Sequence, residues 1–246
     1  MAAVSSSSPN VDALTPQLER DEYFWFENLV FKAGSVVFKV VPQYSLPIED
    51  EEFAALLKPA PGERQTCGLS EEDPIILPAE VTAQDFRSLL KACNPKPNSR
   101  NATLAVDEWM SVLKLSKMWS LDSLRPRAIE EVDKLVAWKS PIEKILLGKK
   151  YAVSKWLLEG YEALGKRRDM VHDKERAVLD ENSFVGLVTL REKAAAAILQ
   201  DAIAAISSES KTSKYTPTTF RDKFDFKSAV KVIFAKELKK DKEYVA

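Results

Sequence analysis

Apolar side chains recur at helical spacing through the middle of the chain, between Leu104 and Val136. In the first half of this stretch, the residues on one predicted helix face are Trp109, Val112, Leu113 and Ser116, and Trp119 continues that face. After a break at Ser120, a predicted N-cap, the same spacing resumes at Leu121, Leu124, Ala128, Val132 and Leu135. Such spacing places one apolar stripe on each helix. The pattern therefore predicts a helical hairpin that buries both tryptophans in a core.

Strand signals precede this hairpin. Leu29 to Phe31 and Val36 to Val41 are rich in β-branched and aromatic residues, with Ala33-Gly34 able to turn between them. The sequence therefore predicts a β-hairpin that ends at Pro42, which lacks an N–H for the ladder. Residues 74–78 form a short apolar run between prolines, which predicts a short strand near a sheet edge.

The other apolar stretches have helical spacing and recognisable starts. Ser140, Pro141 and Glu143 form the clearest helix start, since they supply an N-cap, a first-turn proline and a capping box. Further helices are expected over 46–57, after Thr82, from about Ser154, from Asp180 to about Ile206, and over 229–240. Strands that are early and few, followed only by helices, predict an α+β fold with an all-helical second half.

Composition divides the chain further. Residues 1–20 are rich in Ser and Pro and poor in large apolar side chains, which predicts a flexible tail. Residues 58–73 predict an exposed loop, and 207–217 a polar linker. The expected organisation is a tail (1–20), an α+β domain (21–137), a helical extension (138–206), and a linker with a short C-terminal amphipathic helix (207–246).

Charge and cysteine usage narrow the function classes. The formal net charge is -1, so the bulk balance does not favour nucleic acid or acidic lipid. No apolar run is long enough to span a membrane, and the first residues do not resemble a secretory signal. Cys67 and Cys93 are interpreted as reduced thiols, although the sequence leaves a disulfide between them open. A cytoplasmic or nuclear protein, or one in both places, is expected.

Residue patterns that carry chemistry are missing. His172 is the only histidine and lies in a charged turn, so a catalytic triad or a zinc site is not expected. No glycine-rich phosphate loop occurs, and adjacent acidic pairs such as Glu130-Glu131 do not face each other on a helix. Residues 220–227 mix aromatic and basic side chains, but acidic neighbours cancel the charge, so docking of Phe224 and Phe226 is preferred to nucleic-acid contact. We therefore expect neither an enzyme nor a cofactor.

Three stretches together resemble one known family. They are residues 29–46 (LVFKAGSVVFKVVPQYSL), 73–93 (DPIILPAEVTAQDFRSLLKAC) and 106–128 (VDEWMSVLKLSKMWSLDSLRPRA). Their order is similar to that of BTB/POZ domains, of the type abundant in mushroom-forming fungi, and the likeness covers roughly residues 23–190. It implies a BTB/POZ fold, a small sheet capped by helical hairpins, over 21–137. Asn28 and Val41 depart from the Asp and His that members commonly carry.

The resemblance implies a protein-interaction module. BTB/POZ domains assemble with themselves, with cullin-3 ubiquitin ligase scaffolds or with transcriptional partners. Cullin-3 adaptors often carry an apolar-x-Glu motif before the third strand, which Leu69 and Glu71 match. A transcriptional co-regulator or scaffold without a cullin is the alternative. For self-association, the candidates are the aromatic and apolar residues of the first strand region, Tyr23, Trp25, Phe26, Leu29, Phe31 and Leu46.

Overall fold

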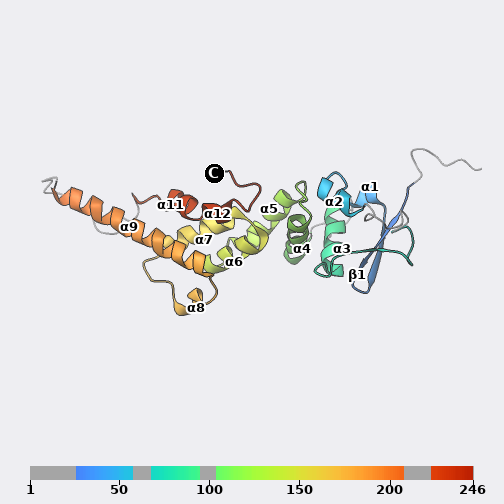
Figure 1. Cartoon of the computed structure of the whole chain (residues 1–246), viewed down its shortest axis with the longest axis horizontal. Helices are drawn as coiled ribbons and strands as arrows, with labels where there is room; N and C mark the ends of the chain where they lie inside the picture. The colour runs from blue at the N-terminus through green and yellow to red at the C-terminus, as the bar shows by residue number, and fades with distance from the viewer. Residues whose placement is uncertain (1–25, 58–67, 95–103, 208–222, 246) are drawn as a thin grey trace, which may run out of the picture.

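The computed structural model describes residues 26–57, 68–94, 104–207 and 223–245. Within them the fold is a mixed α+β arrangement, as the pattern predicted. The molecule is elongated, with a small sheet at one end and the long helix α9 projecting at the other (Figure 1). The predicted tail, most of the 58–73 loop and nearly all of the 207–217 linker lie outside the described residues.

The sheet contains three strands in the order β2-β1-β3. Strands β1 (Leu29–Ala33) and β2 (Val36–Val40) form the predicted hairpin, with Phe31 opposite Phe38. The turn begins at Gly34, whose φ of 59° favours glycine, so β1 runs two residues further than expected. Strand β3 (Ile75–Ile76) pairs in parallel with β1 at a sheet edge, as predicted.

Three helices lie beside the sheet: the short α1 (Pro42–Ser45) and α2 (Glu51–Leu56), and the longer α3 (Ala83–Cys93) (Figure 1). Helix α4 (Val106–Met118) packs on the far side of α3, and α5 (Arg125–Val136) packs on α4. Helix α3 begins with a capping box, because Thr82 Oγ1 accepts from the Asp85 N–H at 3.1 Å and Asp85 accepts from the Thr82 N–H.

The predicted N-cap at Ser120 is wrong. Ser120 has a left-handed backbone with φ 49°, and α5 begins only at Arg125. The intervening turn brings Leu121 into the core with none of its surface exposed. Pro126 then occupies the first turn, where its missing N–H costs nothing. Burial of Leu121 and the position of the proline, rather than the serine hydroxyl, decide where this helix starts.

Buried side chains form three clusters along the molecule. The sheet cluster contains buried side chains of β1 and α3 together with Trp119. The middle cluster joins α4 and α5 to the extension through Trp109 and Trp156. The distal cluster lies within the extension and the C-terminal helices. Both hairpin tryptophans are 4% exposed, so the predicted burial is confirmed. They do not share one side, however, because ten residues at helical spacing place them about 80° apart. Helix α4 thus contributes to two clusters.

The extension is helical throughout. Its helices are α6 (Pro141–Tyr151), α7 (Ser154–Lys166), α8 (Asp173–Arg176) and α9 (Glu181–Ser207). The Ser140 and Glu143 capping box and the cap by Asp180, which accepts from the Ser183 N–H at 2.9 Å, are confirmed. Phe226 is buried and Phe224 packs against the same distal cluster, as expected.

The C-terminal helix is divided in two. Helix α11 (Phe226–Ile233) and helix α12 (Ala235–Leu238) replace the single helix predicted over 229–240. The break falls at Phe234, whose ring stacks on Tyr161 of α7 with centroids 3.7 Å apart. The pair packs on α7 and α9, so the end of the chain returns along the extension (Figure 1).

Candidate interaction surfaces

The loop from Gly68 to Asp73 is fixed at both ends. The Gly68 carbonyl accepts from the N–H of Val30 in β1 at 2.7 Å, and the Gly68 N–H donates to the Asp73 carbonyl at 2.6 Å. Gly68 has φ 87° and is buried against Ile75 of β3. These contacts anchor the base of a small turn to the sheet and direct the residues between them outward.

Leu69 and Glu71 lie on this turn at the surface. Leu69 is 52% exposed and Glu71 is exposed. Hydrogen bonds from its own backbone N–H and from the Ser70 side chain lower the pKa of the neighbouring Glu72 carboxyl. An apolar side chain and a carboxylate are thus exposed two residues apart on a turn whose base is fixed to the sheet.

The six residues predicted for self-association do not form one surface among the described residues. Tyr23 and Trp25 lie outside the described residues. Phe26 is half-buried, with its ring edge-on to Tyr44 at 5.2 Å, and Leu29 is also half-buried.

For Phe31 and Leu46 the prediction needs correction. They are only 1% and 6% exposed, because both pack inside the sheet cluster. Their side chains support the sheet and are not available to a second copy.

The outer face of the sheet is a surface that the sequence did not single out. Lys32 of β1 is in register with Val37 on one side and Ile76 on the other, so the three side chains share this face. Val37 is 45% and Ile76 is 76% exposed. Strand β2 has no neighbouring strand on its outer side among the described residues, so the backbone N–H and C=O groups that point away from β1 can pair with another strand.

Trp138 was also missed. It lies in the turn between α5 and α6 and is 90% exposed, which is unusual for so large an apolar side chain. A groove of about 290 Å³ lies beside this turn, lined by Asp133, Lys134, Val136, Ala137, Lys155, Trp156 and Glu159. Trp138 lies beyond the stretch whose apolar spacing predicted the helical hairpin, so that pattern did not place it.

The histidine and the described cysteine lie on different elements. His172 is exposed, and its backbone N–H donates to the Glu175 carboxylate at the start of the short helix α8. Cys93 is a free thiol whose pKa is raised to about 11, chiefly by burial, so it is a poor nucleophile. Cys67 lies outside the described residues. Across the described part of the chain, no three potential metal-binding side chains gather, and no helix is long and apolar enough to cross a membrane.

Comparisons with known proteins give no relative. No family model matches the chain, and neither the curated proteins nor the solved structures contain a significant match. Function is therefore inferred from the residues and their geometry.

Proposed function

We propose that the protein is a protein-interaction module without catalytic activity, built on a BTB/POZ domain over residues 21–137. The order of elements supports this proposal: a β-hairpin, short helices, a loop, a strand, a helix and a helical hairpin follow one another. The stretches that resemble the family occupy these elements. The half-buried Cys93, whose thiol pKa is raised, and the exposed His172 offer no reactive centre.

The preferred partner is a cullin-3-type ubiquitin ligase scaffold, for which the protein serves as an adaptor. The observation that carries this proposal is the fixed turn that presents Leu69 at 52% exposure beside Glu71. Leu69 fills an apolar pocket of the partner, and the Glu71 carboxylate accepts hydrogen bonds at its rim. A few such residues commonly supply most of the binding energy of an interface.

The second candidate is a scaffold or transcriptional co-regulator that assembles with itself and binds no cullin. The unpaired edge of β2 and the exposed Val37 and Ile76 favour it, since a strand from a second copy can extend such an edge. Residues 21–137 then act through oligomerisation alone.

Affinity capture separates the two candidates. The full chain, carrying a tag, is used to capture partners from a fungal extract, and the cullin is identified by mass spectrometry. The adaptor proposal predicts that wild type retains the cullin and that Leu69→Ala/Glu71→Ala loses it. The control, Leu199→Ala/Glu192→Ala, removes the same residue types from exposed positions on α9 and retains it.

Absence of the cullin from the wild-type capture removes the adaptor proposal. Light scattering then tests the alternative, which predicts a dimer or larger species. A strict monomer at tens of micromolar would contradict it, because that range exceeds the dissociation constants of ordinary stable assemblies, roughly micromolar or tighter.

A further inference from the structure

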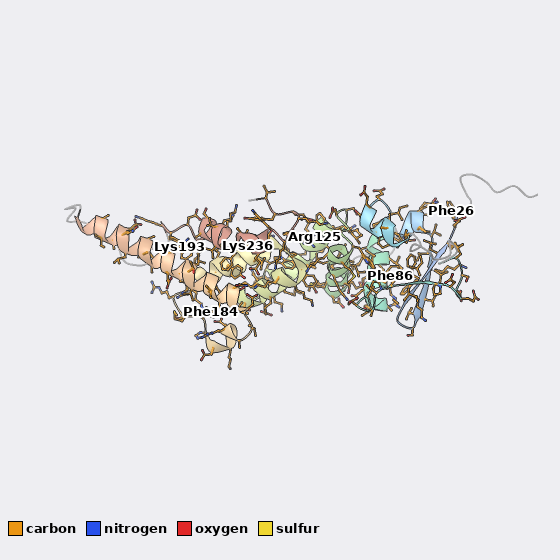
Figure 2. All side chains as sticks on the ribbon, in the orientation of Figure 1. Phe26, Phe86, Arg125, Phe184, Lys193 and Lys236 are labelled. Atoms are coloured by element: carbon orange, nitrogen blue, oxygen red, sulfur yellow. The ribbon has the colours of Figure 1, made fainter. Side chains whose placement is uncertain are left out.

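A buried polar cluster joins the end of the chain to its middle. Arg125, at the start of α5, is 5% exposed, and Asp241, after α12, is 6% exposed. The Arg125 Nη2 and the Asp241 Oδ1 are 3.5 Å apart. Figure 2 shows Arg125 near the centre of the molecule, between the helices beside the sheet and those of the extension. We call residues 239–245 the C-terminal strap.

Asp241 is held by groups from two separate helices. Besides Arg125, the N–H of Ser154 donates to its Oδ2 at 2.8 Å. Ser154 is the first residue of α7, a helix whose N-cap, Val153, provides no side-chain hydrogen bond. Asp241 therefore caps α7 from 87 residues away, and its negative charge also suits the positive end of that helix.

Further hydrogen bonds hold Arg125 in place beside the Asp241 carboxylate. Arg125 Nη2 also donates to the carbonyls of Tyr151 and Ala152, at 3.1 and 2.7 Å, so the cation is oriented by the α6–α7 turn. Burial, and after it the charges of Arg125 and Lys240, lower the pKa of the Lys117 amine, which reflects the crowding of positive charge at this junction.

Several features of the junction are poorly suited to a role in stability alone. The Arg125 Nη1 is buried and has no hydrogen-bond acceptor among the described residues. Ser120 and Ala152, with φ of 49° and 53°, are the non-glycine residues with left-handed backbones in the described chain, and both lie here. Buried ion pairs are weak sources of stability, and local strain gathers where a site must be preorganised.

We propose that this junction is a carboxylate-binding site, that the chain's own C-terminal strap fills it through Asp241, and that its occupancy couples α5 to α7. A guanidinium beside one oxygen and a first-turn helix N–H that donates to the other are suited to a carboxylate. The strap is further held by Lys242, whose Nζ donates to Ser120 Oγ at 2.8 Å. The proposal is independent of any partner at Leu69.

Chemical rescue of the full-length chain tests the site. Asp241→Ala removes the carboxylate that accepts from the Ser154 N–H. Amide hydrogen exchange at Ser154 should therefore accelerate by about tenfold or more, which is the usual effect of losing a hydrogen bond to a charged group. Added sodium acetate should restore protection at Ser154 in a saturable manner, while sodium chloride at equal ionic strength should not. Wild type should respond equally to the two salts.

Two further variants serve as controls. Asp241→Asn keeps the volume filled, so acetate should have no more effect than chloride. Glu243→Ala removes a carboxylate whose side chain is 42% exposed and lies 3.8 Å from Arg125, and Ser154 should stay protected. If Asp241→Ala does not fold, Arg125→Met is measured, and exchange across 239–245 should accelerate while the amides of α11 stay protected. Two results would overturn the proposal. One is unchanged amide exchange, at Ser154 in folded Asp241→Ala or across 239–245 in Arg125→Met; the other is an equal effect of acetate and chloride on Asp241→Ala.

Discussion

Gly68 shows how a single residue positions the proposed contact. Its φ of 87° is unfavourable for other residues, and a Cβ at this position would come within 2.7 Å of the Ile75 side chain. The backbone of the loop can therefore lie directly on β3. This close approach allows the Gly68 N–H to reach the Asp73 carbonyl and close the turn that presents Leu69.

Substitution of this glycine should disturb both stability and binding. Gly68→Ala is expected to lower the free energy of unfolding by about 2–4 kcal/mol, from left-handed strain and overpacking together. The matched control is Gly34→Ala, where φ is 59° but no atom lies within 4 Å of the added Cβ, so only the strain of about 1–2 kcal/mol applies. Urea denaturation measures both. Equal losses in the two variants would show that the loop does not rest on Ile75.

Glu175 supports a pH prediction. Arg167 donates to both Glu175 oxygens, at 2.7 and 2.6 Å, and lowers the pKa of this carboxyl from 4.5 to about 2. Because the folded pKa is depressed, the stabilisation is complete above the unfolded pKa and is lost as the pH falls toward 2. In wild type, the free energy of unfolding should fall between pH 5 and pH 2 as Glu175 is protonated. Glu175→Gln should make this fall smaller by roughly 1 kcal/mol, the size expected for a partly exposed ion pair. An unchanged slope would contradict the assignment.

Among the elements, α6 and α7 are joined most closely. A Cβ at Gly160 of α7 would come within 2.7 Å of both Ile145 Cγ1 and the Pro141 carbonyl of α6. The missing side chain therefore lets the two backbones approach, and this contact sets the position of α7 under the C-terminal strap.

Because of this contact, alanine at position 160 should destabilise the protein, although alanine normally favours a helix over glycine. Alanine normally favours a helix over glycine by about 1 kcal/mol, yet Gly160→Ala should destabilise the protein by about 1–3 kcal/mol through overpacking. Ala163→Gly, at an exposed position of the same helix, should cost about 1 kcal/mol from propensity alone. Guanidinium denaturation gives both values. Stabilisation by Gly160→Ala would show that the helices are further apart.

Elements with local determinants could be predicted from the sequence. The hairpin of β1 and β2 follows from residue type, and the start of α6 follows from Ser140, Pro141 and Glu143, which lie close together in the chain. The start of α5 and the break at Phe234 could not, because each depends on a buried contact with a distant segment: Leu121 in the sheet cluster and Tyr161 under the Phe234 ring.

On the scale of the whole molecule, the middle cluster connects the two halves. Trp156 of α7 packs there with Trp109 and Val132, and its Nε1 donates to Asp133 of α5. The expected boundary between residues 137 and 138 therefore lies beside a shared core rather than at an open linker. We expect the described halves to unfold together.

Trp156→Ala tests this cooperativity. Deleting a fully buried tryptophan should cost about 3–5 kcal/mol, and both halves should lose their structure in one transition. Trp138→Ala, which removes a 90% exposed tryptophan, should change the unfolding free energy by less than about 0.5 kcal/mol. Thermal unfolding followed by far- and near-ultraviolet circular dichroism measures both. Separate transitions for the two signals would show independent domains.

The surfaces were only partly predictable. The exposure of Leu69 and Glu71 follows from the glycines, prolines and charges around them, so the sequence was sufficient for this loop. Arg125 and Asp241 are 116 residues apart, and no local pattern could pair them. Phe31 and Leu46 were assigned to a partner because an apolar side chain near a strand suits an interface and a core equally well.

Calorimetric titration with a purified cullin-3 scaffold tests the central claim most directly. The account predicts that wild type binds and that Leu69→Ala/Glu71→Ala binds at least about tenfold more weakly, since two central interface residues commonly contribute more than 1 kcal/mol each. The circular dichroism spectrum of that variant should match wild type. Equal affinity for the two proteins, or no heat of binding with wild type, would contradict the claim that this loop is the partner-binding surface.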